Sequence, residues 1–272
     1  MISTDFTGKC VFVAGGTSGI NLGIAEAFAG AGSKVAVMSR SADKVRAATD
    51  QLARHGGEVF GETADVRDYD AVAGVLSRAH AALGPIDVLV SGAAGNFLAE
   101  ALNLSPNGFK AVVDIDLNGT FHVLKAAHPF LRKPGASIIN ISAPQSYNPA
   151  PMQVHACAAK AGMDQVMRVL ALEWGAHGIR VNSIVPGAIS DTVGLQKLTT
   201  EREREALATR VPLRRLGKCG DIASMALFLG SPLSSFVTGA LIPVDGGLSL
   251  LGGRGNFEHA SFPAINQEGD KT

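Results

Sequence analysis

Residues 10–31, CVFVAGGTSGINLGIAEAFAGA, decide the fold of this chain. A short apolar run, Cys10–Val13, leads into the glycine-rich segment Ala14–Asn21, and a helical stretch follows. A glycine-rich turn between a first strand and a first helix leaves backbone N–H groups free at the positive end of the helix. Such groups can bind a pyrophosphate, so this stretch predicts a nucleotide-binding unit. The alternative is an ordinary strand-to-helix turn, but such turns rarely need three glycines.

The rest of the chain repeats this alternation of strand and helix. Short apolar runs lie at 11–13, 35–38, 88–90, 138–141, 181–185 and 241–244, with a weaker one at 58–63. Helical stretches lie at 19–31, 42–55, 69–83, 103–132, 152–176 and 219–229. Uninterrupted apolar runs are typical of strands buried on both faces of a parallel sheet. We therefore predict an α/β fold: a single Rossmann-type, doubly wound parallel sheet with helices on both faces. One domain should span 1–251, followed by a glycine-rich and polar tail over 252–272.

Composition excludes several classes of function. The chain has 272 residues, with 24 basic and 24 acidic side chains and no formal net charge. This balance argues against nucleic acid or an anionic membrane as the main partner, because both select a basic excess. Hydrophobic residues make up 46% of the chain, which excludes wholesale disorder. Three cysteines without a CxxC pair predict neither a disulfide framework nor a structural metal site.

Two stretches bear on location. The first ten residues, MISTDFTGKC, lack the basic head and apolar run of a signal peptide, which predicts a cytoplasmic protein. Residues 222–244 carry no charged side chain over a length that could span a bilayer. Gly230, Pro232 and Pro243 interrupt this stretch, so we expect a short helix, a turn and a strand there, and no membrane span.

The spacing Gly15-x-x-x-Gly19-x-Asn21 resembles the TGxxxGxG loop of the short-chain dehydrogenase/reductase family. Asn21 stands where that family has its third glycine, which permits close helix packing. We expect Asn21 to displace the helix slightly or to form a local hydrogen bond. The residues of this loop predicted to contact a dinucleotide are Gly15, Thr17, Ser18, Gly19 and Ile20.

The end of the second strand predicts which dinucleotide is bound. An NAD enzyme would place Asp or Glu there to hold the ribose diol. This chain reads Met38-Ser39-Arg40. Arg40 offers several donors to a 2′-phosphate, and Ser39 can add one more. We therefore predict NADPH as the cofactor; the alternative is that Arg40 is merely solvated.

The resemblance to this family covers residues 8–247. It implies that Asp65 holds the adenine amino group and that Lys160 binds the nicotinamide ribose. The further cofactor residues that it implies are Val66, Ala93, Pro186, Gly187 and Ile189. The family usually forms homotetramers, which we also expect here.

Two catalytic side chains of the family are absent. The family carries a Tyr four residues before the Lys and a Ser thirteen residues before that Tyr; these positions are Ala156 and Ala143. Neither alanine can donate a proton, so an ordinary ketone would be reduced to an alkoxide that nothing at these positions could protonate. His155 is predicted to be a packing residue or a subunit contact, and Cys157 a packed thiol. Tyr147, in the preceding loop, is a candidate for an unorthodox acid.

A subgroup of the family lacks this Tyr. The segments at 93–97, 113–116, 153–156 and 186–192 resemble peroxisomal-type 2,4-dienoyl-CoA reductases, and the related trans-2-enoyl-CoA reductases share Val154-His155. These enzymes reduce a carbon–carbon double bond conjugated to a thioester. Hydride attacks the far end of the conjugated system, charge collects on the thioester oxygen, and the proton goes to carbon. Such chemistry needs an oxyanion donor and a proton source near the α-carbon, but no Tyr.

The resemblance implies a catalytic role for Asp116, sharing a water network with Lys160. Asp114 lies two residues away on the same predicted helix and should point elsewhere. For the substrate, an acyl-CoA thioester, the resemblance indicates Arg67, Asn96 and Phe97; Arg67 could instead be solvated and Phe97 a core residue.

The match has two departures and leaves other functions open. Ser91-Gly92 replaces the family's Asn-Asn, and the terminal Asp270-Lys271-Thr272 is no peroxisomal address. We predict an NADPH-dependent dienoyl- or enoyl-CoA reductase. The alternatives are an inactive NADP-binding protein and a carbonyl reductase that uses Tyr147.

Overall fold

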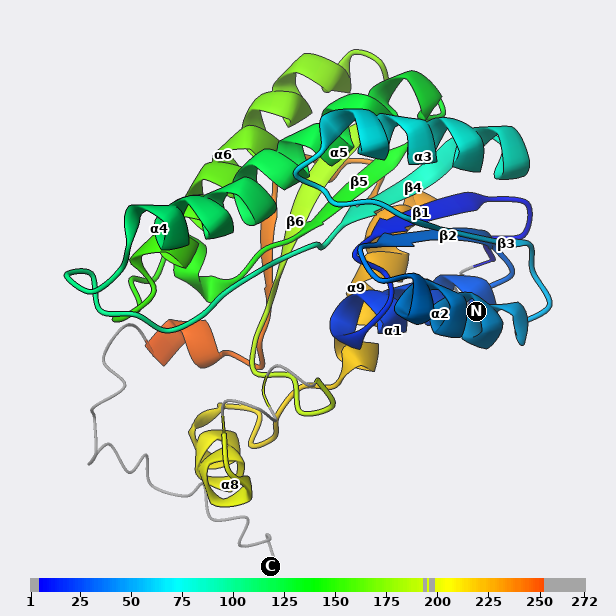
Figure 1. Ribbon diagram of the computed structural model, residues 1–272. Helices are drawn as coiled ribbons and strands as arrows, with labels where there is room; N and C mark the ends of the chain where they lie inside the picture. Colours follow the sequence, from blue (N-terminus) through cyan, green and yellow to red (C-terminus); the bar gives the residue numbers. More distant parts are fainter. Residues whose placement is uncertain (1–4, 193–194, 196–198, 252–272) are drawn as a thin grey trace, which may run out of the picture.

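The sheet has seven parallel strands in the order β3-β2-β1-β4-β5-β6-β7 (Figure 1). The computed structural model describes residues 5–192, 195 and 199–251. The strands are β1 (Cys10–Ala14), β2 (Lys34–Ser39), β3 (Val59–Thr63), β4 (Ile86–Ser91), β5 (Ser137–Ile141), β6 (Arg180–Pro186) and β7 (Leu241–Val244). The parallel Rossmann-type sheet is therefore confirmed.

Helices cover both faces of the sheet, as predicted (Figure 1). One face packs against α1 (Gly19–Gly30), α2 (Ala42–Ala53) and α9 (Cys219–Gly230). The other packs against α3 (Tyr69–Leu83), α5 (Gly119–Ala127) and α6 (Val154–Gly175). Each of these helices begins and ends within two residues of its predicted bounds, except α5, which forms only part of a longer predicted helix.

The two cores explain the uninterrupted apolar strands. In β1, Val11 and Val13 belong to the core under α1 and α9, whereas Phe12 belongs to the core under α3 and α5. All three side chains are fully buried. Each such burial stabilises the fold by about 1.5–3 kcal/mol, so a polar residue on either face of β1 would be costly.

The predicted helix over 103–132 is not continuous. It begins at α4 (Pro106–Val113), after the N-cap Ser105, whose hydroxyl accepts the Gly108 N–H at 3.0 Å. A π-helical turn over Asp114–Asn118 then joins α4 to α5, and a short 3-10 turn (His128–Phe130) ends the run. Periodicity does not show a π turn, because it occupies only five residues. Such turns often lie at functional sites.

One helix was not predicted. α8 (Glu201–Arg210) projects beyond the carboxyl end of β6 and buries no residue (Figure 1). Its sequence, EREREALATR, has no apolar stripe from which a helix could be predicted. The available signal was the capping box, in which Thr200 and Glu203 satisfy each other's backbone N–H groups.

Within the described ranges, no helix combines the length and the apolar character needed to cross a membrane. Residues 222–244 form the rest of α9, a 3-10 turn (Pro232–Ser234) and β7, which confirms the predicted helix, turn and strand. The predicted tail over 252–272 lies outside the described residues.

The order of strands changes direction between β1 and β4, which are neighbours in the sheet although not in sequence. In open α/β sheets, ligands bind in the crevice beyond the carboxyl ends of the strands at this switch point. The loops after β1, β2, β4 and β5 all reach this edge of the sheet, so we expect the ligand-binding site there.

Candidate active site

Two cavities open at the switch point. The first, here called the loop cavity, has a volume of about 310 Å³. It contains the predicted cofactor residues Gly15, Thr17, Ser18, Ser39, Arg40, Asp65, Val66 and Ala93. The second, here called the lysine cavity, has a volume of about 370 Å³ and contains Gly19, Ile20, Asn96, Asp116 and Lys160. The two cavities share Ser18, Asn21, Gly92 and Ala94, so together they can hold an elongated ligand.

The phosphate loop needs glycine where β1 ends. Gly15 has a φ of +79°, and a Cβ there would lie 2.8 Å from the backbone nitrogen of Ala93. Only glycine satisfies both conditions. Close packing of α1 against α9 depends on Gly23 and not on the third loop position, which Asn21 occupies. A Cβ at position 23 would lie 2.8 Å from the Cβ of Cys219 in α9.

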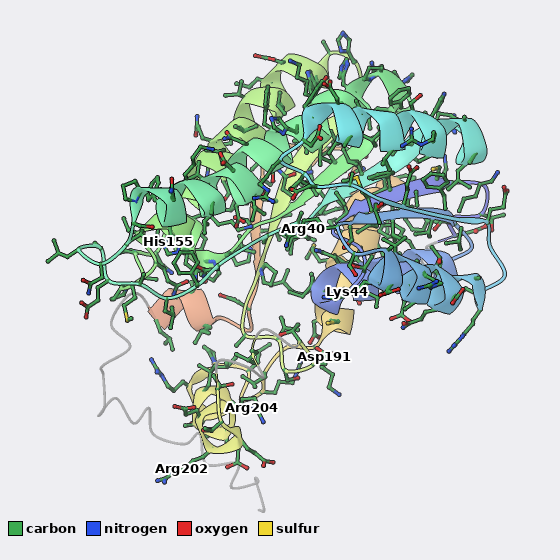
Figure 2. The ribbon with its side chains drawn as sticks, in the orientation of Figure 1. Arg40, Lys44, His155, Asp191, Arg202 and Arg204 are labelled. Atoms are coloured by element: carbon green, nitrogen blue, oxygen red, sulfur yellow. The ribbon has the colours of Figure 1, made fainter. Side chains whose placement is uncertain are left out.

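Two cations lie at the far end of the loop cavity. Arg40 follows β2, and Lys44 lies in the first turn of α2 (Figure 2). Neither side chain forms an ion pair with a described residue, whereas Arg46 on the same helix pairs with Asp43. Sequence reasoning missed Lys44, although its position four residues after Arg40 on a predicted helix was a usable signal. Together the two cations suit a phosphate group.

The cofactor preference should depend on Arg40. An Arg–phosphate hydrogen bond contributes about 1.5–3 kcal/mol, so Arg40→Ala should weaken NADPH binding roughly ten- to a hundredfold and leave NADH nearly unchanged. Lys44→Ala should have a smaller effect in the same direction. Dissociation constants from NAD(P)H fluorescence test this, with Arg46→Ala as the matched control. Equal losses for both cofactors would contradict the assignment.

Asp65 holds a neighbouring arginine at the rim of the loop cavity. Arg67 donates from Nε and Nη2 to the Asp65 carboxylate at 3.0 and 2.6 Å. These hydrogen bonds lower the pKa of Asp65, with smaller contributions from the nearby charges of Arg67 and Arg40. Arg67, predicted to contact substrate, is therefore paired with Asp65, and any anionic ligand must compete with that pair.

Asp116 and Lys160 form a buried ion pair in the lysine cavity. Their side chains are only 2% and 8% exposed, and Asp116 Oδ2 lies 3.3 Å from Lys160 Nζ. Asp116 Oδ1 accepts the Gly95 N–H at 2.7 Å, and Lys160 also donates to the Ile141 carbonyl at 3.0 Å. Both charged groups are therefore fixed in position.

Asp114 points away from this pair, as predicted. Its carboxylate accepts hydrogen bonds from Lys110 and, at 3.0 Å, from Asn118 on the outer side of the π turn. The hydrogen bond from Lys110 is the main reason that the pKa of Asp114 is lowered. Asp114 and Asp116 thus have separate surroundings, which makes Asp114 a suitable control.

Carboxamide groups line the place where the family has its Ser and Tyr. Ala143 and Ala156 both face the lysine cavity, together with Asn96 and Gln145. Asn96 Nδ2 and Gln145 Nε2 donate to Gln153 Oε1 at 2.7 and 3.1 Å. Each donor amide keeps a second N–H. Such groups can stabilise negative charge on a thioester oxygen. Sequence reasoning did not identify Gln145 or Gln153 as parts of one polar cluster.

Neither Tyr147, the proposed unorthodox acid, nor His155 or Cys157 lines the lysine cavity. His155 is fully buried, and its ring centroid lies 4.6 Å from that of Phe97, an arrangement of the kind expected for a packing residue (Figure 2). Phe97 is 44% exposed, so it packs on His155 and also faces outward. Tyr147 is 41% exposed and does not line the lysine cavity. Cys157 is partly buried, with its thiol free.

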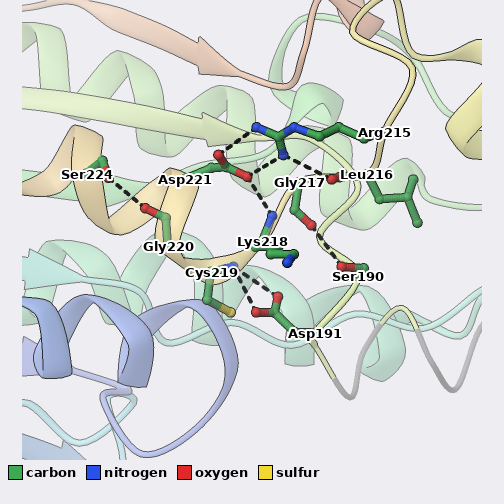
Figure 3. Close-up of polar contacts among 10 residues, drawn as sticks. All are labelled: Ser190, Asp191, Arg215, Leu216, Gly217, Lys218, Cys219, Gly220, Asp221 and Ser224. Atoms are coloured by element: carbon green, nitrogen blue, oxygen red, sulfur yellow. Dashed lines mark hydrogen bonds and ion pairs between the residues drawn. The ribbon is translucent and has the colours of Figure 1, made fainter.

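The segment after β6 is tied to α9 near both of its ends (Figure 3). The Asp191 carboxylate accepts the Cys219 N–H at 2.9 and 3.1 Å, and Arg215 donates to Asp221 at 2.7 and 2.8 Å. The hydrogen bonds from Arg215 lower the pKa of Asp221 to about 2, so this pair persists at neutral pH.

The predicted cofactor residues at the end of β6 lie outside the two cavities. Pro186 ends β6, whereas Gly187 and Ile189 line a separate cavity of about 490 Å³. Thr192, in the same segment, reaches the lysine cavity.

The comparisons agree on the fold and on the family. The family described as "Enoyl-(Acyl carrier protein) reductase" matches residues 14–249. The solved structure of an actinorhodin polyketide ketoreductase with NADPH superimposes with a TM-score of 0.83 at 28% identity. That match covers 88% of this chain and 97% of the ketoreductase.

Two curated relatives are named peroxisomal 2,4-dienoyl-CoA reductases that produce (3E)-enoyl-CoA. The Saccharomyces cerevisiae protein is 40% identical over 95% of this chain and 89% of its own length. The Pongo abelii protein is 42% identical over 94% of this chain and 90% of its own length. These peroxisomal relatives contradict the prediction of a cytoplasmic protein, which rested on composition and on the terminal residues alone. Identity at this level over nearly the whole chain, together with the family match, shows that the chain is an oxidoreductase of the short-chain dehydrogenase/reductase family.

Proposed function

We propose that the chain is an NADPH-dependent reductase of a conjugated carbon–carbon double bond in an acyl-CoA thioester, acting on 2,4-dienoyl-CoA. One observation carries the proposal. The chain keeps a buried Asp116–Lys160 pair in a cavity where Ala143 and Ala156 replace the family's Ser and Tyr. Burying two charges carries a desolvation penalty of several kcal/mol per ion, so retention of the whole pair supports catalysis over cofactor binding alone, for which Lys160 without Asp116 would suffice.

The residues of the lysine cavity match what this reduction requires. When bound, NADPH supplies the hydride, which adds to the δ-carbon of the dienoyl group. The remaining N–H groups of Asn96 and Gln145 donate to the thioester oxygen, where negative charge collects. Asp116 and Lys160 hold a water that delivers a proton to the α-carbon, leaving a double bond between the β- and γ-carbons.

The proposed NADPH site combines both cavities. Ser39, Arg40 and Lys44 would hold the 2′-phosphate, and Asp65 the adenine amino group. Lys160 would bind the hydroxyls of the nicotinamide ribose. The ketoreductase of similar fold was solved with NADPH, which supports this choice over NADH. Of the remaining proposed contacts, the phosphate loop, Val66 and Ala93 line these two cavities. Pro186, Gly187 and Ile189 remain proposed contacts from the sequence resemblance alone, and Gly187 and Ile189 line the separate cavity of about 490 Å³.

An apolar rim suits the acyl chain. Phe97, Leu98, Met152 and Val154 are all 44–53% exposed. The Ala99 N–H donates to the Met152 carbonyl at 2.9 Å, which joins the segment after β4 to the segment that leads into α6. Exposed apolar residues grouped beside a cavity indicate a binding surface. Arg67 is the proposed contact for a CoA phosphate, in competition with Asp65.

We also propose a homotetramer built on the domain over 1–251. Exposed apolar side chains lie on α4 and α5 (Phe109, Phe121), on α6 (Val169, Leu172) and on or just after the 3-10 turn Pro232–Ser234 (Leu233, Phe236). A tetramer with two-fold symmetry needs at least two different interfaces on each subunit, and separate exposed apolar faces could supply them. Light scattering should then give a mass about four times 28.0 kDa.

The test is NADPH oxidation with three substrates: a 2,4-dienoyl-CoA, a 2-enoyl-CoA and a ketone. The dienoyl thioester should react fastest, and the ketone should not react. Turnover of the ketone alone would indicate a carbonyl reductase and direct attention to Tyr147. Tight NADPH binding without turnover of any substrate would indicate an inactive binding protein.

Restoring the family's Tyr should lower activity. Ala156 is 4% exposed and packs with Val112 and Ala159, so the ring of Ala156→Tyr must extend into the lysine cavity. There it would occupy the space proposed for substrate and water. Rates on dienoyl-CoA should fall for Ala156→Tyr alone and together with Ala143→Ser. A clear gain in the double variant would show that the site has been misassigned.

A further inference from the structure

Asn21 bridges the crevice between the phosphate loop and the end of β4. Its Nδ2 donates to the Gly92 carbonyl at 2.7 Å and, at a longer 3.4 Å, to the Gly15 carbonyl. Both partners are acceptors, so the nitrogen, and not the oxygen, must face them. One side chain in the first turn of α1 thus joins the residues that follow β1 and β4, the two strands at the switch point.

Gly92 is the counterpart of this bridge. A Cβ at position 92 would lie 2.2 Å from Asn21 Oδ1, 2.4 Å from Nδ2 and 2.5 Å from Cγ. No side chain at position 92 can therefore coexist with the Asn21 carboxamide as placed. The two departures from the family pattern, Asn21 for the third glycine of the loop and Gly92 for the second Asn of the Asn-Asn pair, are therefore sterically matched in this chain.

The pair lies where a dinucleotide would cross from one cavity to the other. Asn21 and Gly92 line both the loop cavity and the lysine cavity. Asn21 Oδ1 is buried and has no hydrogen-bond partner in the part of the chain that the structure describes. The carboxamide is thus held by its nitrogen alone, and its contacts join the two walls of the crevice.

We infer that Asn21 is a positioning residue for the cofactor, paired with Gly92. By holding the two walls together it fixes the N–H groups of the phosphate loop at the spacing that a pyrophosphate requires. This inference rests on the proposed function only in taking a nicotinamide dinucleotide as the ligand. The Asn21 bridge acts on the pyrophosphate, which NADPH and NADH share. Loss of the bridge should therefore weaken the binding of both cofactors equally, whereas loss of Arg40 should weaken only that of NADPH.

The test measures dissociation constants for NADPH and NADH, without acyl-CoA, alongside the melting temperature. Asn21→Ala should raise both dissociation constants by the same factor, roughly fivefold or more, because it removes two hydrogen bonds. The melting temperature should fall by no more than several degrees, because two hydrogen bonds contribute little to the stability of a chain of this size. Gln51→Ala is the matched control: it removes a carboxamide that joins α1 to α2 through Glu26, outside the crevice, and should leave both constants unchanged.

The exchange variant makes the test specific. Gly92→Asn alone should lose most cofactor binding, whereas Asn21→Gly combined with Gly92→Asn should recover binding to within a fewfold of the starting protein. If Gly92→Asn does not fold, Asn21→Ala and the exchange variant decide the matter. The inference would be overturned if Asn21→Ala left both dissociation constants unchanged, or if the exchange variant bound the cofactors no more tightly than Gly92→Asn does. Either result would leave the proposed reaction intact. Failure of dienoyl-CoA turnover with intact binding would instead overturn the proposed reaction alone.

Discussion

Asp116→Ala is expected to lower kcat on a dienoyl-CoA by about 10²–10⁴, the usual contribution of a general acid–base group. The substitution removes the carboxylate that would hold the proton-delivering water. It leaves the phosphate loop untouched, so NADPH affinity should change far less than kcat. Steady-state kinetics and NADPH titration on the same preparation measure both quantities.

Two further variants separate the roles of this carboxylate. Asp116→Asn should retain more activity than Asp116→Ala, because an amide can still hold a water but cannot relay a proton. Asp114→Ala should be nearly silent, because the side-chain partners of Asp114 among the described residues are Lys110 and Asn118, on the outer side of the π turn. A near-normal kcat for Asp116→Ala would mean that the proton comes from elsewhere, and Tyr147 would become the next candidate.

Lys160→Met is expected to destabilise the protein by about 3–5 kcal/mol, the usual effect of removing one partner of a buried ion pair. The Asp116 side chain is 2% exposed, and Lys160 is its only cationic partner among the described residues. Without it, a buried carboxylate would keep only the Gly95 N–H as a hydrogen-bond donor. Denaturant unfolding of the cofactor-free protein, compared with the unsubstituted chain, gives the difference.

A double substitution shows whether charge is the cause. Combining Lys160→Met with Asp116→Asn removes both charges, so the double variant should be more stable than Lys160→Met alone. If Lys160→Met costs less than about 1 kcal/mol, the two groups are not coupled in the way that their burial indicates. If the double variant is no more stable than Lys160→Met, the loss of stability comes from packing rather than from an unpaired carboxylate.

Much of the fold follows from local sequence. The apolar run at 11–13 and the glycines after it specify a strand and a loop, because burial on both faces and a positive φ at Gly15 each restrict the residue type. The helix α8 escaped prediction because nothing in it is buried. The π turn at Asp114–Asn118 escaped because five residues carry no period of their own.

The site was less predictable than the fold. Asp116 and Lys160 were identified through resemblance to a family, and the structure brings them to 3.3 Å of each other. Lys44, Gln145 and Gln153 become meaningful only when loops far apart in sequence meet at the edge of the sheet. Asn21 was expected to act locally, yet its shortest hydrogen bond reaches position 92, which no local pattern could indicate.

The positions of isotope labels in the product show directly which carbons receive the hydride and the proton. The enzyme would be given a 2,4-dienoyl-CoA with NADPH deuterated at the transferring carbon, and in a second run with unlabelled NADPH in deuterated water. We expect cofactor deuterium on the δ-carbon, solvent deuterium on the α-carbon and a 3-enoyl-CoA product. Cofactor deuterium on the carbonyl carbon or the β-carbon, or solvent deuterium on the γ-carbon with a 2-enoyl product, would contradict it.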